Sequence, residues 1–151
     1  MTEATHAPAK PAKPEPRKIP RPLPRADIYA KTKPFWEAAN EGRLMMQFCR
    51  DTARFQWFPR SGSVYTGKRN IEWREVSGRG TVYSWTVAVA PWPGHEDRVP
   101  YVCALVELDE GVRMLANLFN VPADEVAIGM PVKLMWERLS ETYNYPAFEP
   151  A

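Results

Sequence analysis

The sequence predicts a mainly β fold with an N-terminal helix, in the form of a small β-barrel. Beyond residue 43, segments rich in β-branched and aromatic residues alternate with turns marked by Gly, Pro and Asp, which is the pattern of short strands. Roughly five strands, with a short irregular insertion before the last, suit a small closed or partly open barrel. A β-sandwich is the competing architecture, but it usually needs about seven strands. With 151 residues, 44% hydrophobic and 12% aromatic, the chain can bury one core.

The first 26 residues are expected to lie outside this core as a disordered Pro/Lys-rich tail. Residues 1–25 contain seven prolines and carry six basic against two acidic residues, so their net charge is +4 and that of the remainder is near −2. Proline fixes φ and removes a backbone donor, which favours an extended or disordered chain. The tail is then a solubilising leader or a docking arm. The body, being slightly acidic, is not expected to bind nucleic acid.

A short helical segment is predicted for residues 27–42. Thr32 can cap the first turn, Pro34 suits that turn, and Gly42 can end the helix. Helical spacing gives the segment an apolar face made of Phe35, Trp36 and Ala39. This face should pack on the barrel from outside.

Six segments after the helix have strand character. They are residues 43–48, 71–76, 81–90, 101–108, 112–119 and 131–139. The sequence Asp109-Glu110-Gly111 marks a hairpin turn, and residues 91–100 form a Pro/Gly-rich loop. The segment 131–139 is expected to be the last strand.

The strand 81–90 places several large side chains on one face. Alternation assigns Tyr83, Trp85, Val87 and Val89 to the same side. We expect these side chains to fill the barrel interior or to contact the helix. A nucleic-acid-binding module of the oligonucleotide-binding type, which would use such rings as stacking platforms, is a weaker alternative.

Residues 49–67, CRDTARFQWFPRSGSVYTG, fit neither a complete helix nor a long strand. The segment opens with Cys49 and contains a cluster of three aromatic residues, Phe55, Trp57 and Phe58, with Tyr65 further along. With only two cysteines in the chain, a disulfide framework is not expected. The other cysteine, Cys103, alternates along a strand and should be a buried, unreactive thiol.

No complete catalytic constellation is visible in the sequence. Of the two histidines, His6 lies in the tail and His95 in a loop beside Asp97, without an accompanying nucleophile or metal motif. The glycines around Arg79 indicate a β-turn rather than a phosphate-binding loop, because no helix follows them. No apolar run approaches the ~18–20 residues that span a bilayer, and the N-terminus lacks the apolar core of a secretory signal. The expected location is therefore the cytoplasm, and the expected role is binding or accessory.

Several segments together resemble the DUF35 family. They are KPFWEAANEGRLMMQFC, EWREVSGRGTVYSWTV, GHEDRVPYVCALVELDEGVRMLANL and IGMPVKLMWE. The resemblance covers residues 30–149 and implies an N-terminal helical part, a rubredoxin-like zinc ribbon and a C-terminal OB-fold. On this basis residues 43–76 correspond to the ribbon and residues 77–151 to a five-stranded OB-fold barrel.

The resemblance also implies a role in acyl-CoA metabolism. Members of the family accompany thiolase-like enzymes, including sterol-carrier-type thiolases, or MaoC-type hydratases, and the partner is expected to hold the catalytic residues. By analogy this chain would be the non-catalytic subunit of an aldolase or thiolase complex acting in steroid or fatty-acyl side-chain degradation. A coenzyme A thioester would be the substrate of the complex, and this chain would bind no cofactor of its own.

The ribbon departs from the family pattern at its metal ligands. The family has two C-x2-C pairs about ten residues apart, and this chain places Cys49, Thr52, Ser63 and Thr66 at the four positions. Structural Zn²⁺ takes Cys, His or carboxylate ligands, so no metal is expected. A structural zinc contributes on the order of 10 kcal/mol to the folding of a small ribbon. In its absence the hairpin is held by packing of its rings and of Trp73, or the rings complete their burial against a partner, flanked by Arg54 and Arg60.

Two sets of site residues follow from these expectations. The residues expected to contact coenzyme A or substrate are Arg79, Trp92, His95, Arg98 and Tyr101. The residues expected at the partner interface are Phe35, Trp36, Arg54, Phe55, Trp57 and Phe58. The alternative from another class is a free-standing acyl-CoA hydratase or thioesterase that uses His95 with Asp97.

Overall fold

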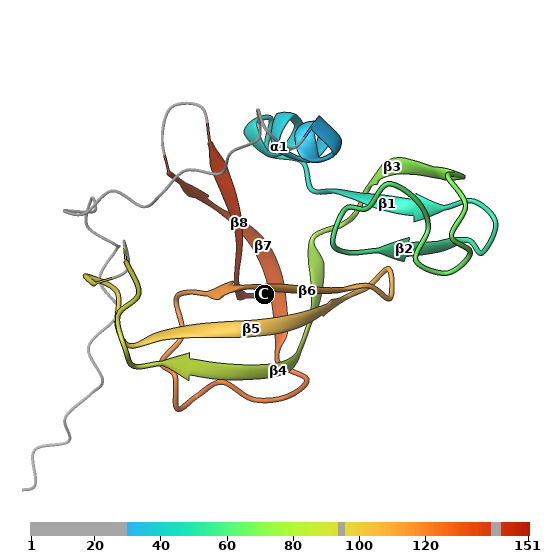
Figure 1. Cartoon of the computed structure of the whole chain (residues 1–151). Coiled ribbons are helices and arrows are strands. Elements are labelled where there is room, and N and C mark those ends of the chain that lie inside the picture. The colour runs from blue at the N-terminus through green and yellow to red at the C-terminus, as the bar shows by residue number, and fades with distance from the viewer. Residues whose placement is uncertain (1–29, 94–95, 140–142) are drawn as a thin grey trace, which may run out of the picture.

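A computed structural model describes residues 30–93, 96–139 and 143–151. The described residues form a closed barrel and a smaller three-stranded sheet beside it, with one α-helix packed where the two meet (Figure 1). We call residues 45–75, which form the three-stranded sheet and its loops, the small lobe. One continuous hydrophobic core runs through the helix, the small lobe and the barrel. The structure confirms the mainly β fold with a helix at its front.

The small lobe is an antiparallel sheet with strand order β2-β1-β3. Its strands are β1 (Met45–Cys49), β2 (Arg54–Gln56) and β3 (Ile71–Glu75). β1 is the central strand, and its Phe48 is opposite Phe55 of β2 and Glu72 of β3. The loop 57–70 between β2 and β3 carries the remaining aromatic residues of the segment that has no obvious fold in the sequence.

The barrel closes in the order β4-β5-β6-β8-β7, with β7 returning to β4. Its strands are β4 (Arg79–Ala88), β5 (Tyr101–Leu108), β6 (Arg113–Leu118), β7 (Pro131–Arg138) and β8 (Asn144–Pro150). The closed barrel is confirmed, as is the hairpin turn between β5 and β6, where Gly111 has a φ of +75°. A helix able to cross a membrane is not found in the ranges that the structure describes.

Two strands, β2 and β8, were not expected from the sequence. β2 has only three residues and lies inside the aromatic segment. β8 contains Pro146 and Pro150, and proline is unusual within a sheet because it cannot donate to the ladder. The expectation that residues 131–139 form the last strand is therefore wrong. Phe148 of β8 is fully buried and pairs with Leu118 in the parallel contact that joins β6 to β8.

The inward face expected for residues 81–90 is wrong for Tyr83 and Val89. The register shifts between Val82 and Ser84, and such a bulge changes which side chains point inward. Val82 is buried, whereas the Tyr83 ring is 45% exposed and lies under the Arg113 guanidinium. Trp85 is half-buried against the core, as expected, whereas Val89 is exposed.

The helix α1 (Lys33–Asn40) follows one 3-10 turn, η1 (Ala30–Thr32). Thr32 lies at the N-cap position, as expected, but its side chain makes no capping hydrogen bond. Gly42 ends the helix with a φ of +78°, and its N–H donates to the carbonyl of Ala39 at 3.0 Å. The positive φ is a conformation that glycine adopts without steric cost.

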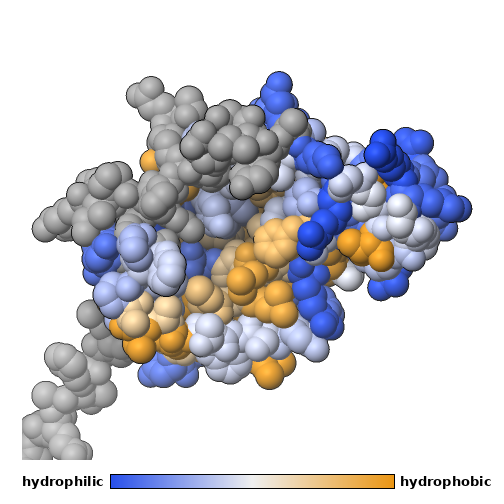
Figure 2. Space-filling model, in the orientation of Figure 1, coloured by the Kyte–Doolittle hydropathy of each residue, from blue (hydrophilic) through white to orange (hydrophobic). Residues whose placement is uncertain are grey.

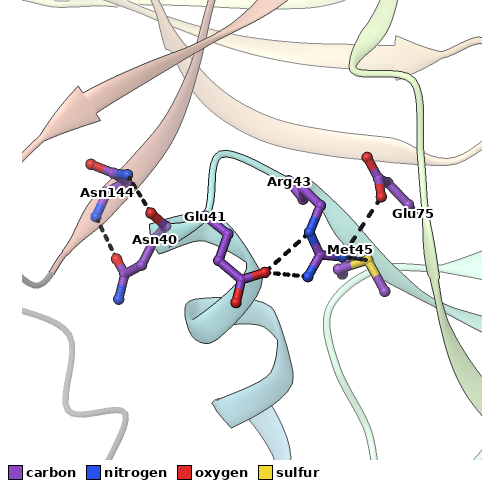
Figure 3. A network of polar contacts seen from close by, with 6 residues as sticks. All are labelled: Asn40, Glu41, Arg43, Met45, Glu75 and Asn144. Atoms are coloured by element: carbon purple, nitrogen blue, oxygen red, sulfur yellow. Dashed lines mark hydrogen bonds and ion pairs between the residues drawn. The ribbon is translucent and has the colours of Figure 1, made fainter.

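The C-terminal end of α1 is fixed to the barrel by polar contacts (Figure 3). The Asn144 backbone N–H donates to Asn40 Oδ1 at 3.1 Å, and the Asn144 side chain donates to the Ala39 carbonyl at 3.1 Å. Arg43 pairs with Glu41 at the helix end and with Glu75 of the small lobe. The Asn144 side chain is thus a second donor to a carbonyl of the last helical turn. Together these contacts link the helix end to the barrel and to the small lobe.

Candidate functional site

An apolar groove of about 150 Å³ lies where the helix, the small lobe and the barrel meet. Thr32, Phe35 and Trp36 line it from the helical side, residues 57–59 from the small lobe, and Met114, Leu115, Tyr145 and Pro146 from the barrel. In the space-filling view, hydrophobic side chains gather between the barrel and the small lobe (Figure 2). The groove is therefore built from three parts of the chain that the fold brings together.

The apolar side chains at the rim of the groove are exposed, whereas the apolar side chain at its floor is buried. Phe58 is 57% exposed and Leu115 is 56% exposed, whereas Phe35 is 3% exposed. The Trp57 ring contacts both Phe35 and Phe58. Its centroid lies 5.0 Å from the Phe35 ring centroid and 5.2 Å from the Phe58 ring centroid. Large exposed apolar side chains around a hollow are typical of a surface that another molecule covers.

Three of the residues expected at a partner interface, Trp36, Trp57 and Phe58, line the groove. The expectation for Phe35 is corrected, because its ring forms the buried floor and is not available to a partner. Leu115 and Tyr145 belong to the groove but were missed, because nothing in the sequence shows that β6 and β8 border the small lobe.

Two other residues expected at the interface lie elsewhere on the small lobe. The half-buried Phe55 ring packs edge-on against Phe48 at 5.0 Å. The Arg54 guanidinium stacks on the Tyr65 ring at 4.2 Å. Neither Arg54 nor Phe55 lines the groove.

The residues expected to bind coenzyme A do not form one site. Arg79 begins β4 and pairs with Asp109 at 3.4 Å. Tyr101 pairs instead with Ala88 at the other end of that ten-residue strand, and Trp92 follows the same end. At about 3.3 Å per residue, the two ends of β4 are roughly 30 Å apart. Trp92 is 72% exposed at its end of the barrel, and His95 lies outside the described residues.

Arg98 does not present a free guanidinium to a phosphate group. It pairs with Glu137, and the two side chains are only 15% and 12% exposed. Its guanidinium also lies 5.3 Å from the Phe119 ring centroid. The charge of an arginine held this way is already matched by a carboxylate, so the expectation that Arg98 binds phosphate is corrected.

The positions that correspond to metal ligands contain a hydrogen-bonded cluster. Ser63 Oγ donates to Cys49 Sγ at 3.0 Å, and both residues are buried. The Thr52 hydroxyl contributes to the same environment, although its buried Oγ1 makes no regular hydrogen bond to any described residue. Thr66 Oγ1 accepts instead from the backbone N–H of Lys68 at 3.3 Å.

This donor set does not fit zinc. One thiol and three neutral hydroxyls cannot replace four thiolates. Across the described ranges, no three His, Cys, Asp or Glu side chains come together as a metal site.

A chelator such as EDTA is therefore expected to leave the melting temperature unchanged, as differential scanning calorimetry can check. A fall of several degrees on chelation, restored by zinc, would contradict this prediction.

The hydroxyl cluster lowers the pKa of Cys49 from 9.0 to about 7, mainly through the hydrogen bond from Ser63 and secondarily through Thr52. Folding therefore favours the thiolate, so its stabilising contribution is complete above about pH 9 and is lost as the pH falls through 7. We expect Ser63→Ala to raise the thiol pKa, which ultraviolet absorbance of the thiolate measures in a Cys103→Ser background. An unchanged pKa would contradict the assignment. The melting-temperature difference between the two proteins should also widen from pH 7 to pH 9.

Two buried glutamines hold the loop that follows β2. Gln47 Nε2 donates to the Arg60 carbonyl at 2.9 Å, and Gln47 Oε1 accepts from the Arg60 N–H at 2.8 Å. Gln56 donates to Gln47 and to the Gly62 carbonyl, and it accepts from the Val64 N–H at 2.9 Å. The side chains are 3% and 2% exposed. Sequence reasoning missed this network, whose only signal was the presence of both glutamines in the apolar strands around Cys49.

The aromatic residues of the small lobe divide between the two expected roles. Phe55, Trp57 and Trp73 are partly buried against the core, as expected of rings that hold a hairpin together, and Trp57 also lines the groove. Phe58 is instead exposed at the groove, as expected of a ring that a partner covers.

Comparison with protein families gives two matches. The ChsH2 rubredoxin-like zinc ribbon domain matches residues 36–62, and the ChsH2 C-terminal OB-fold domain matches residues 73–137. The chain is also similar to a solved Ltp2-ChsH2(DUF35) aldolase, with 34% identity and a TM-score of 0.72 over 86% of this chain and 98% of that one. The barrel is thus an OB-fold, and the small lobe is a zinc-ribbon region.

Three relatives show which kinds of protein have sequences similar to this one. A DUF35 domain-containing scaffold protein of Methanocaldococcus jannaschii is 32% identical over 103 residues, which cover 62% of this chain and 72% of that protein. A probable enoyl-CoA hydratase alpha subunit of Thermomonospora curvata is 37% identical over 128 residues, which cover 85% and 40%. The 3-oxo-4,17-pregnadiene-20-carboxyl-CoA hydratase alpha subunit of Mycobacterium tuberculosis is 40% identical over 118 residues, which cover 77% and 36%. The chain therefore spans well under half the length of the two hydratase subunits.

Proposed function

Because this chain belongs to the DUF35 family, we propose that it is a non-catalytic accessory subunit of an acyl-CoA-metabolising complex. Its partner would be a thiolase-fold aldolase or thiolase subunit. This chain would stabilise the partner and help to form the channel for the acyl-CoA. The aldolase that contains a similar DUF35 chain and the relative called a scaffold protein support this role.

The observation that carries the proposal is the exposed apolar groove. Phe58 and Leu115 at its rim are each more than half exposed. The half-buried Trp36 and Trp57 line the same groove. Interface cores are enriched in aromatic residues and concentrate binding energy in a few central side chains. We propose that a thiolase-fold subunit covers this groove, and that Trp36, Trp57 and Phe58 are its main contacts.

The proposed substrate of the complex is a coenzyme A thioester with a steroid or fatty-acyl chain. The two relatives named as hydratase alpha subunits support the coenzyme A thioester, and the name of one of them supports a steroid-derived acyl group. A MaoC-like hydratase subunit is the alternative partner, supported by the same two names.

Activity measurements test the division of labour. Acyl-CoA cleavage would be followed for this chain alone, for a thiolase-fold aldolase subunit alone, and for an equimolar mixture. We expect no turnover from this chain and a higher rate or longer half-life for the mixture than for the aldolase alone. Turnover by this chain alone, or a mixture no better than the aldolase, would contradict the proposal.

A further inference from the structure

A second hollow, of about 340 Å³, lies in the small lobe next to the apolar groove. Residues 60–64 line it together with Gly67 and Arg69. The hollow is open to solvent and does not form an enclosed cavity. We call it the basic hollow, because its lining contains two arginines and no carboxylate.

The two arginines of the basic hollow differ from two of the other arginines of the small lobe. Arg50 and Arg74 both pair with Glu72. Within the described parts of the chain, neither Arg60 nor Arg69 forms an ion pair with a carboxylate, and both are exposed. Two unpaired guanidinium groups at one hollow leave a local positive charge that favours an anion.

The backbone of the basic hollow is fixed before any ligand arrives. Gln47 bonds both the N–H and the carbonyl of Arg60. The Ser63 N–H donates to the Lys68 carbonyl at 2.8 Å, and the Gly67 N–H donates to the Ser63 carbonyl at 2.9 Å. Lys31, which lies outside the small lobe in η1, also contacts the hollow, since its Nζ donates to Ser61 Oγ at 2.8 Å. The loop backbone therefore loses little conformational entropy when a ligand binds.

The basic hollow is continuous with the apolar groove along the chain. Residues 57–59 line the groove, and Arg60 begins the hollow. The segment at the start of the helix also borders both sites. Thr32 lines the groove, and the side chain of its neighbour Lys31 donates a hydrogen bond to Ser61 of the hollow. The surface therefore places a fixed cationic site at the edge of the proposed partner interface.

We propose that the basic hollow binds the phosphate groups at the nucleotide end of the coenzyme A thioester. The planar guanidinium groups of Arg60 and Arg69 would donate to phosphate oxygens, a pairing that arginine makes with two parallel hydrogen bonds. The acyl end of the same molecule would then run along the seam between the groove and the partner. This inference rests on the proposed function and assigns the nucleotide to the 60–69 loop rather than to Arg79 or Arg98.

Binding of coenzyme A to the full chain tests the inference by isothermal titration calorimetry at low salt. The variants are Arg60→Gln and Arg69→Gln, and the matched control is Arg54→Gln, which changes an exposed arginine of the same lobe outside the hollow. Each hollow variant should weaken binding about tenfold, in line with a lost charge-assisted hydrogen bond. The control should bind coenzyme A as the unchanged chain does.

Probe ligands identify which anionic group is bound. Coenzyme A and adenosine 3′,5′-bisphosphate should bind more tightly than 3′-dephospho-coenzyme A, and inorganic phosphate should bind more weakly than all three. Equal binding of all four ligands would mean adventitious phosphate binding and would overturn the proposal. So would an absence of saturable coenzyme A binding, or variants that bind as tightly as the unchanged chain. Complex formation with an aldolase subunit is measured separately, so loss of this inference leaves the accessory role open to its own test.

Discussion

Replacing Gln56 by leucine is expected to lower the free energy of unfolding by about 2–4 kcal/mol, since each polar group left unpaired in a buried site costs about 1–3 kcal/mol. The substitution removes the acceptor for the Val64 N–H and the donors to Gln47 and to the Gly62 carbonyl. In a zinc ribbon the metal joins the two hairpin turns, whereas here the glutamine pair ties β1 and β2 to the loop 60–64. Urea denaturation followed by tryptophan fluorescence measures the loss.

Two further measurements separate a lost network from a general packing defect. The double variant Gln47→Leu/Gln56→Leu should lose less stability than the sum of the single variants, because the two side chains bond to each other. Hydrogen exchange should accelerate most at the Arg60 and Val64 amides, whose acceptors are the glutamine side chains. Additive losses, or unchanged exchange at these amides in the single variants, would contradict the role assigned to the pair.

Replacing Phe58 by serine is expected to weaken the complex with the thiolase-fold subunit by at least about thirtyfold. Central aromatic residues of an interface commonly contribute 2 kcal/mol or more, and about 1.4 kcal/mol corresponds to a factor of ten. Because Phe58 is 57% exposed in this chain, its removal should leave the melting temperature nearly unchanged. Surface plasmon resonance against the immobilised aldolase subunit measures the change in Kd.

The matched control for Phe58 is Ile128→Ser. Ile128 is 73% exposed on the loop before β7 and does not line the groove. The Ile128→Ser variant should bind the aldolase subunit with the same Kd as the unchanged chain. A Phe58→Ser variant that binds as tightly as the Ile128→Ser variant would show that the groove is not the interface.

The local signals in the sequence were sufficient for most of the fold. Strands such as 101–108, which β5 matches residue for residue, are marked by β-branched residues on both sides of a clear turn. β8 could not be recognised because its two prolines oppose strand formation locally, whereas its stability comes from the burial of Phe148 between strands that are distant in sequence.

The candidate site was only partly predictable for the same reason. The aromatic residues 57 and 58 could be singled out because they cluster in one segment. Their neighbours Leu115 and Tyr145 lie on barrel strands, and only the tertiary fold brings them to the groove. The separation of Arg79 from Trp92 by the length of β4 likewise depends on strand direction, which residue type alone does not show.

The molar mass of the assembled complex tests the central claim most directly. This chain and a thiolase-fold aldolase subunit would be co-expressed, purified through a tag on this chain, and examined by size-exclusion chromatography with light scattering. The account predicts one peak that contains both proteins, with a mass equal to a whole-number combination of the two subunits. Separate elution of the two proteins, each at its own mass, would contradict the claim that this chain is an accessory subunit of such a complex.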